Sequence, residues 1–172
     1  MERTQHIYRG RKKEKSDKMT GAQLLINIMA WFVIHMFIAH RCTKISDFYL
    51  KKDLALFKVH SWETVGIYKK FGVHRWKTWL PDAGKLFKRG FYKKKWESRT
   101  KEYAQLFLIE TNRAELTHWI SILPSILFFI WNSPFIGVWM VIYAIIANVP
   151  FILVQRYNRI RIHQVVLKLK RN

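Results

Sequence analysis

The polar stretch 110–119, Glu-Thr-Asn-Arg-Ala-Glu-Leu-Thr-His-Trp, carries the side chains of this sequence that are best suited to proton transfer. If the stretch is helical, a rotation of about 100° per residue places Thr111, Glu115 and His118 within about 60° of one another. A neutral imidazole can remove a proton from a hydroxyl that attacks an ester or thioester, and a carboxylate one turn away can orient the ring. We therefore predict that Glu115 and His118 form a catalytic pair.

Glu110 and Arg113 lie on a different side of the same predicted helix. Residues three apart on a helix can form an ion pair, so these two side chains can simply bind each other. Arg113 could instead hold a phosphate group or a developing oxyanion of a substrate. Charged groups at the end of a hydrophobic span also commonly mark only the membrane boundary, so the spacing leaves these interpretations open.

Other catalytic and metal-binding motifs are absent from the sequence. No histidine is followed five residues later by Asp, as in the His-x-x-x-x-Asp motif of glycerolipid acyltransferases, and no Gly-x-Ser-x-Gly elbow or P-loop occurs. The single cysteine, Cys42, cannot form an internal disulfide, and His60, His74 and His163 are too scattered for a zinc site. We therefore predict no metal site.

Charge and hydrophobicity are separated along the chain rather than mixed. The 172 residues carry a formal net charge of +20, and 50% of them are hydrophobic. A basic arm (1–18) is followed by an apolar run, a basic middle (41–103), a long apolar region and a basic tail. A soluble domain of this charge would usually bind nucleic acid, but the segregation favours contact with anionic lipid. We expect a single membrane-embedded domain over 1–172, multi-pass in the cell membrane, and no nucleic-acid partner.

The sequence predicts an all-α integral membrane protein with about three hydrophobic helices, at 21–39, about 116–131 and 135–154. The segment 116–131 is short for a span, so we expect it to extend into a helix that begins near Tyr103. At about 1.5 Å per residue, a helix over 21–39 can roughly cross a hydrocarbon core of about 30 Å. Asn132-Ser133-Pro134 is a turn signal between the other two helices. Pro150 lacks an N–H and is expected to kink the last helix.

The basic middle, residues 41–103, holds 17 Lys or Arg and six acidic residues, with aromatic side chains recurring among the charges. Trp and Tyr prefer the headgroup level of a bilayer, and Lys and Arg attract anionic lipid. We therefore expect this segment to lie at the membrane interface. The preference of basic segments for the cytoplasm favours a cytoplasmic middle and tail.

The first hydrophobic helix, 21–39, can be a full span, a re-entrant helix or a cleaved signal. A full span would place the basic arm and the basic middle on opposite sides of the membrane, against the charge rule. No A-x-A-like cleavage site follows Ala39, so a retained helix is favoured. Asn27 and His35 are eight residues apart and share one helix face, which we expect to contact protein or a cavity rather than lipid.

Two long, ungapped blocks of the sequence are similar to a known family. The first is Ile109-Glu-Thr-Asn-Arg-Ala-Glu-Leu-Thr-His-Trp-Ile-Ser-Ile-Leu-Pro124, and the second is Tyr143-Ala-Ile-Ile-Ala-Asn-Val-Pro-Phe-Ile-Leu-Val-Gln-Arg-Tyr-Asn-Arg159. Both resemble the glycosyl-4,4′-diaponeurosporenoate acyltransferases. The resemblance covers roughly 104–171, a helical hairpin with its tail, and is looser before that, mainly around Trp76-Lys77 and Leu80.

The resemblance implies an activity. Members of this family are bacterial membrane enzymes that complete staphyloxanthin by esterifying the sugar of a C30 carotenoid glycoside with a fatty acid. It implies no cofactor, only an acyl donor, acyl-CoA or acyl carrier protein, held by basic side chains of the middle. In this reaction His118 would deprotonate a sugar hydroxyl, while Arg113, Asn148 or Gln155 would stabilise the oxyanion. Arg156, in the second block, is a further candidate for substrate binding.

Two alternatives stay open at this level. The acceptor could be another glycolipid, which the sequence does not distinguish from a carotenoid glycoside. The chain could also be a non-catalytic membrane scaffold that associates with other enzymes of carotenoid synthesis through its basic middle. A scaffold would tolerate replacement of Glu115 and His118, whereas an enzyme that uses them would not.

Overall fold

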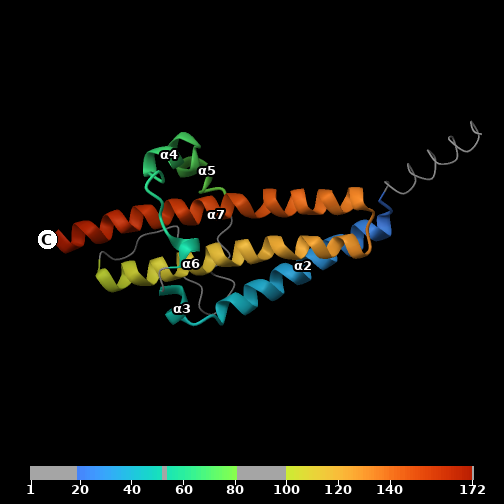
Figure 1. Cartoon of the computed structure of the whole chain (residues 1–172), viewed down its shortest axis with the longest axis horizontal. Coiled ribbons are helices and arrows are strands. Elements are labelled where there is room, and N and C mark those ends of the chain that lie inside the picture. Colours follow the sequence, from blue (N-terminus) through green and yellow to red (C-terminus); the bar gives the residue numbers. More distant parts are fainter. Residues whose placement is uncertain (1–18, 52–53, 81–99, 172) are drawn as a thin grey trace, which may run out of the picture.

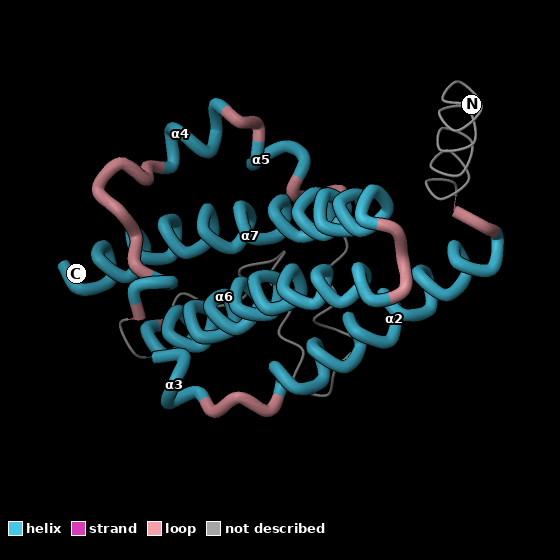
Figure 2. The backbone as a smooth tube through the Cα atoms, turned by 45° about the vertical axis from the view of Figure 1, so that its right-hand side comes forward, coloured by secondary structure: helices cyan, strands magenta, loops and turns pink. Residues whose placement is uncertain are grey.

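Three long helices form the frame of the molecule. The computed structural model describes residues 19–51, 54–80 and 100–171, with side chains described as far as Leu167. Helices α2 (Gly21–Thr43), α6 (Lys101–Ile122) and α7 (Pro134–Arg171) run lengthwise beside one another (Figures 1 and 2). Every element in these described ranges is helical, so the all-α class is confirmed.

The predicted helical hairpin is present, but its first arm consists of two successive elements, an α-helix and a 3-10 helix. Helix α6 continues directly into the 3-10 helix η3 (Leu123–Ile130), and α7 returns antiparallel after the turn at 131–133. The hydrophobic segment 116–131 is therefore divided between two elements. Pro124 lies in the first turn of η3, where its missing N–H removes a helical hydrogen bond.

Two described helices, rather than three, are long and apolar enough to cross a membrane: α2 and the part of α7 from Pro134 to Leu167. The segment 116–131 does not stand alone: the expected extension back toward Tyr103 is present, since α6 begins at Lys101 with charged turns. Helix α7 likewise joins the predicted 135–154 helix to the basic tail and continues through Pro150.

Polar side chains attach α2 to the turn of the hairpin. Asn27 and Asn132 exchange reciprocal amide hydrogen bonds of 3.1 and 3.0 Å, and Trp131 Nε1 donates to Asn27 Oδ1 at 2.7 Å. A capping box of Thr20 and Gln23 begins the helix beside this turn. The expectation that Asn27 faces protein is confirmed, and α2 is an integral part of the fold.

The described part of the basic middle forms four short helices: α3 (Asp47–Lys51), η1 (Ala55–Phe57), α4 (Val65–Lys70) and α5 (Val73–Trp76). Helices α4 and α5 meet at Gly72, whose φ of 69° is a left-handed conformation that favours glycine. Tyr68 of α4 and Val73 of α5 are buried against Tyr157 of α7. The middle is thus packed onto the outside of the hairpin.

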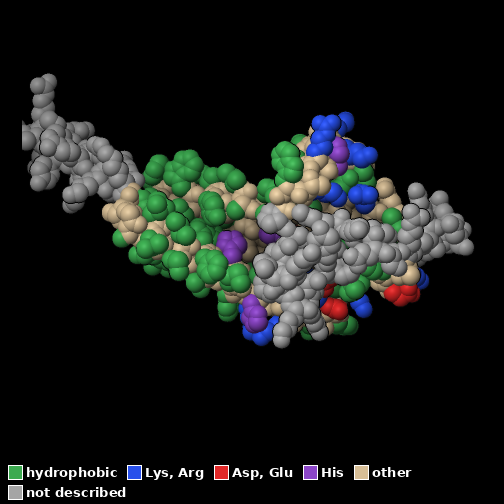
Figure 3. Space-filling view, turned by 180° about the vertical axis from the view of Figure 1, so that it is seen from behind, with side chains coloured by type: hydrophobic (Ala, Val, Ile, Leu, Met, Phe, Trp, Pro, Cys, Tyr) green, Lys and Arg blue, Asp and Glu red, His purple; other side chains and the backbone are tan. Residues whose placement is uncertain are grey.

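The two halves of the molecule have different surfaces. On the face shown in Figure 3, hydrophobic side chains cover the half that holds α2, η3 and the start of α7, and Lys and Arg gather at the edges of the other half. Aromatic side chains also project from the charged half: Phe71 is 73% exposed and Trp79 is 85% exposed. This arrangement is the one expected of an interfacial middle segment beside an apolar helix bundle.

Close packing of η3 against α7 depends on Gly137. A Cβ atom at this position would lie 2.5 Å from Cδ1 of the Phe129 ring. Alanine is otherwise favoured over glycine within helices by up to about 1 kcal/mol, so the clash opposes the helical preference.

Gly137→Ala is expected to lower the free energy of unfolding by about 1–3 kcal/mol, the usual cost of overpacking. Thermal unfolding of the purified protein in detergent measures it. Gly66→Ala is the matched control, because its nearest atom, Thr64 Oγ1, lies at an ordinary 3.6 Å. Equal unfolding temperatures for the two variants would contradict the packing argument.

Candidate functional site

Glu115 lies between two arginines in the interior of the hairpin. Its side chain is fully buried. Arg156 Nη1 donates to Glu115 Oε1 at 2.9 Å, and Arg159 Nη2 donates to Glu115 Oε2. The two arginines are three residues apart on α7, so both reach α6 from the same side of their helix. Both oxygens of the carboxylate are therefore occupied by guanidinium groups.

A second carboxylate, Glu63, completes the network from the segment before α4. It binds Arg156 in a two-pronged geometry, with Nε to Oε1 and Nη2 to Oε2 both at 2.7 Å. Tyr68 donates its hydroxyl to Glu63 Oε1 at 2.6 Å. Arg156 thus connects the basic middle, α6 and α7 through one side chain.

The two glutamates and two arginines balance in charge. Removing charges from water costs several kcal/mol for each ion, and this cost is offset only where pairing and hydrogen bonding are nearly complete. The bidentate Arg156–Glu63 pair and the doubly paired Glu115 meet that condition. The network is therefore a fixed structural unit in which loss of one member leaves a buried charge uncompensated.

The pKa values of Glu63 and Tyr68 are displaced in opposite directions. Burial by itself raises the pKa of Glu63, but hydrogen bonds from Arg156, Tyr68 and the His60 backbone outweigh it and hold the pKa at about 2. Burial and the hydrogen bond to Glu63 raise the pKa of Tyr68 to about 12. At neutral pH the pair is therefore a carboxylate and a neutral phenol.

Arg159 has one donor without a partner in the described part of the chain. Its Nε donates to Asn112 Oδ1 at 2.8 Å, and its guanidinium lies 5.3 Å from the centre of the Phe57 ring. The remaining terminal nitrogen, Nη1, is buried and makes no hydrogen bond with the described residues. Gln155 Oε1 is likewise a buried acceptor without a described partner. On α6, Thr111 Oγ1 is also buried without a described partner, so polar atoms of both helices are left uncommitted by the described residues.

The ring of His118 is oriented by Asn148. His118 Nδ1 lies 3.0 Å from Asn148 Oδ1, and the Nδ2 of the same amide donates to the Ala144 carbonyl at 2.9 Å. Since the amide oxygen can only accept, Nδ1 donates in this contact, and the neutral form of this tautomer has its lone pair on Nε2. Phe151 stacks on the ring at 4.6 Å between centroids and holds its plane.

Glu115 and His118 both lie on α6, but they contact different residues of α7. The carboxylate faces Arg156 and Arg159, whereas the imidazole faces Asn148. Asn148 supplies the orientation that a carboxylate was expected to supply. A direct Glu115–His118 pair remains a prediction.

Arg113 is engaged elsewhere. The predicted ion pair with Glu110 is present at 3.1 Å, and Arg113 also binds Asp47 at 2.6 Å. Its Nη1 donates to the carbonyls of Cys42 and Ile45, at 3.1 and 2.6 Å. These contacts join α6 to the end of α2 and the start of α3, so Arg113 stabilises the packing of these helices. A role in substrate binding remains a prediction.

Sequence reasoning selected Glu115, Arg156, His118 and Asn148, which the structure brings into two adjoining clusters. It missed Glu63, Tyr68 and Arg159. The i, i+3 spacing of Arg156 and Arg159 at the end of an apolar helix could have shown the second arginine. Nothing local marks Glu63, because its partner Arg156 is 93 residues away. Among the described residues, no group of His, Cys, Asp and Glu side chains has the arrangement of a metal site.

The described chain has two helices long and apolar enough to cross a membrane. A buried arginine–glutamate network beside an oriented imidazole marks a candidate functional site in such a protein. Residues 51–168 match the sequence profile of the glycosyl-4,4′-diaponeurosporenoate acyltransferases. The chain belongs to this family and is an acyltransferase. The match begins in the basic middle, so it also covers Glu63.

Relatives that carry this name agree with the assignment. The protein of Staphylococcus aureus strain MRSA252 is 38% identical over 146 residues, which covers 83% of this chain and 87% of the relative. The protein of strain N315 is 38% identical over 145 residues with the same coverage. No solved structure matches the chain.

Glu115→Gln is expected to lower the free energy of unfolding by about 3 kcal/mol or more, because two buried guanidinium groups lose their shared counter-charge. Chemical unfolding in detergent measures the change. Glu102→Gln, at an exposed position in the first turn of α6, is the control and should change stability by less than about 0.5 kcal/mol. Comparable losses in both variants would argue against the network.

The Glu63→Gln variant is expected to lose less free energy of unfolding than the wild type as the pH is lowered. The pKa of Glu63 falls from 4.5 to about 2 on folding, so its contribution is present above pH 4.5 and is lost as the pH falls toward 2. The free energy of unfolding measured across this range should decline less steeply in the variant than in the wild type. Parallel profiles would show that Glu63 is not held as an anion by Arg156.

Proposed function

We propose that this protein esterifies a sugar hydroxyl of a glycosylated C30 carotenoid with a fatty acyl group, the last step of a staphyloxanthin-type pigment. Its family and the names of its relatives support the reaction. The observation that carries the proposal is the His118–Asn148 contact, which orients the ring through Nδ1. In the proposal the neutral imidazole uses the lone pair of Nε2.

The reaction needs a base for the sugar hydroxyl. His118 Nε2 accepts the hydroxyl proton as the oxygen attacks the acyl carbonyl, which forms the new C–O bond. When the donor is a thioester, the C–S bond breaks, and the imidazolium returns the proton to the leaving thiolate. Asn148 is the positioning residue, because its oxygen stabilises the protonated Nδ1 throughout this cycle.

The uncommitted polar atoms of α7 suggest how substrates are held. Gln155 Oε1 can accept a hydrogen bond from a sugar hydroxyl, and Arg159 Nη1 can donate to a developing oxyanion or a phosphate oxygen. Arg156 contributes through the ion pairs that fix Arg159 and Glu115. In this proposal Glu115 holds the arginines in place rather than moving the proton.

The acyl donor is proposed to be acyl-CoA or acyl carrier protein, which approaches the charged half of the molecule. Exposed cations of α4 and α5 (Lys69, Lys70 and Arg75) lie there, in the region where Lys and Arg gather in Figure 3. Their charge can attract the phosphates of either donor before the thioester reaches the site.

The protein is proposed to cross the cell membrane more than once, with its apolar half in the bilayer. The two long apolar helices support this placement. Helix α2 begins beside the hairpin turn through Asn27 and Asn132 and ends beside Arg113 through the Cys42 carbonyl, so it follows the full length of the apolar half. This course favours a full span over a re-entrant helix, with residue 19 and the basic middle on opposite sides.

His118→Ala is expected to reduce acyl transfer by about 10²–10⁴-fold, the usual contribution of a positioned base. Transfer of a labelled fatty acid to the carotenoid glycoside is measured with membrane-inserted protein. His60→Ala, an exposed histidine of the middle, is the control and should retain activity. Near-normal turnover of His118→Ala would reject the assignment.

The acceptor is tested in cells that make the glycosylated carotenoid. Mass spectrometry of their pigments, with and without this protein, should show a mass increase of one fatty acyl group only when the protein is present. If a different glycolipid is acylated and the pigment is unchanged, the protein is an acyltransferase with another acceptor.

A further inference from the structure

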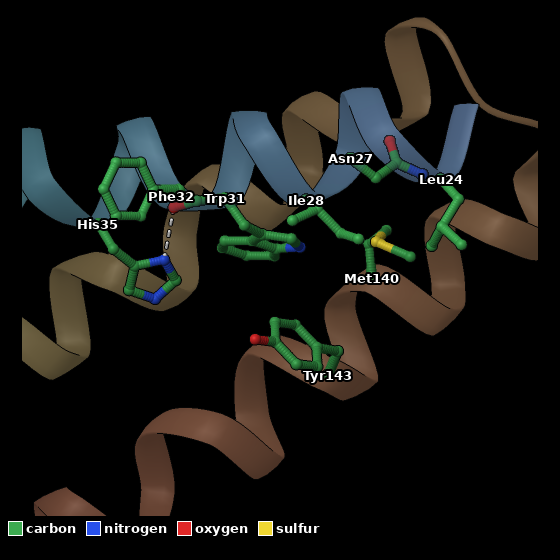
Figure 4. A pocket seen from close by; sticks show the side chains of 8 residues that line it. All are labelled: Leu24, Asn27, Ile28, Trp31, Phe32, His35, Met140 and Tyr143. Atoms are coloured by element: carbon green, nitrogen blue, oxygen red, sulfur yellow. Dashed lines mark hydrogen bonds between the residues drawn. The ribbon is translucent and has the colours of Figure 1, made fainter. Parts of the chain in front are cut away.

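A groove of about 520 Å³ lies between α2 and α7 in the apolar half of the molecule. Its main walls are drawn in Figure 4: Ile28, Trp31, Phe32 and His35 from α2, and Met140 and Tyr143 from α7. Neither the arginine–glutamate network nor His118 lines it. The groove is thus a separate feature on the same pair of helices.

Aromatic rings form the floor and sides of the groove. The Trp31 ring stacks on Phe128 of η3 at 4.6 Å between centroids and lies 5.5 Å from the Tyr143 ring. Trp31 is only 7% exposed, whereas Phe32 and Tyr143 at the rim are 62% and 50% exposed. A long, thin apolar group can therefore lie on a buried ring while contacting two exposed ones.

Trp31 contributes a buried donor that nothing in the described chain satisfies. Its indole Nε1 has no hydrogen-bond partner, whereas the neighbouring Trp131 donates to Asn27 at 2.7 Å. Figure 4 shows the Trp31 nitrogen directed along the groove toward Ile28 and Met140. A buried unsatisfied donor costs about 1–3 kcal/mol, so a phenylalanine would be the better residue unless the N–H meets a ligand.

The chemistry of that ligand follows from the donor and the rings. A saturated acyl chain offers no acceptor to an N–H group and no π face to an aromatic ring. A conjugated polyene offers both along its whole length, through N–H···π contacts and ring stacking. Met140 is unbranched and flexible, so it can move aside as the chain enters. We infer that this groove binds the polyene chain of the acceptor, and this inference rests on the proposed function.

The groove lies about one and a half turns of α7 from the residue that orients the proposed base. Tyr143 and Asn148 are five residues apart on α7, about 7.5 Å along a helix. Ala144 packs against Trp31, and its carbonyl holds the amide of Asn148 that orients His118. A polyene that lies on Trp31 therefore points one end toward His118, where a sugar attached to that end would be acylated.

Ile28→Trp tests the groove by filling it. The full-length variant in phospholipid nanodiscs is expected to show a KM for the glycosylated C30 carotenoid that is raised about tenfold, with its preference for donor chain length unchanged. Leu25→Trp is the matched control: it lies on the same helix, is 61% exposed and does not line the groove. The control should retain the wild-type KM.

Two outcomes of this experiment would overturn the inference. A changed preference for donor chain length, with an unchanged KM for the carotenoid, would mean that the acyl chain occupies the groove. Unchanged values for both substrates would mean that no substrate chain binds there.

Binding is measured separately from catalysis. The wild-type protein should induce visible circular dichroism in the glycosylated carotenoid, because an asymmetric groove holds the polyene in one twist. Trp31→Phe retains a ring but lacks the N–H, and should weaken this binding by about two- to fivefold. If the wild-type protein binds the carotenoid but does not acylate it, the proposed function is rejected and the assignment of the groove stands. No induced signal in the wild type would reject the groove, even if transfer occurs.

Discussion

The burial of Glu115 between two arginines is the constraint on which the arrangement of the site depends. Arg156 and Arg159 stand at the point where the apolar part of α7 gives way to the basic tail. A buried guanidinium group needs a counter-charge, and α6 and the basic middle provide one each through Glu115 and Glu63. The hairpin and the segment before α4 are therefore held in one register by charge as well as by packing.

The buried ion pairs give Glu115 and His118 different partners, although the sequence pattern predicts that the two residues act as a pair. Glu115 and His118 share one helix, yet the carboxylate serves the arginines and the imidazole is oriented by Asn148. In the proposed reaction, the ion network keeps its charge while His118 takes up the proton of the hydroxyl. In the further proposal, an extended acceptor that lies in the apolar groove between α2 and α7 reaches the same base.

Much of the frame could be predicted from the sequence, because hydrophobic length and turn residues act locally. The turn near Asn132-Ser133-Pro134, the helical hairpin and the inward position of Asn27 all follow from such patterns and are present. The division of 116–131 between α6 and η3 was not predicted. Thr100 caps the first turn of α6, which agrees with the predicted extension of this helix back toward Tyr103, and Pro124 favours a tighter turn in the part that follows.

The amino-acid sequence shows that the chain is helical, that its apolar and basic parts are segregated, and that it belongs to an acyltransferase family. These properties depend on composition, periodicity and continuous motifs. The partners of the polar residues follow only from the folded structure. Glu63 and Arg156 are 93 residues apart, and Glu115 and Arg156 are 41 apart. The low dielectric of a buried site makes such pairing obligatory, but only the folded chain decides which opposite charge is within reach.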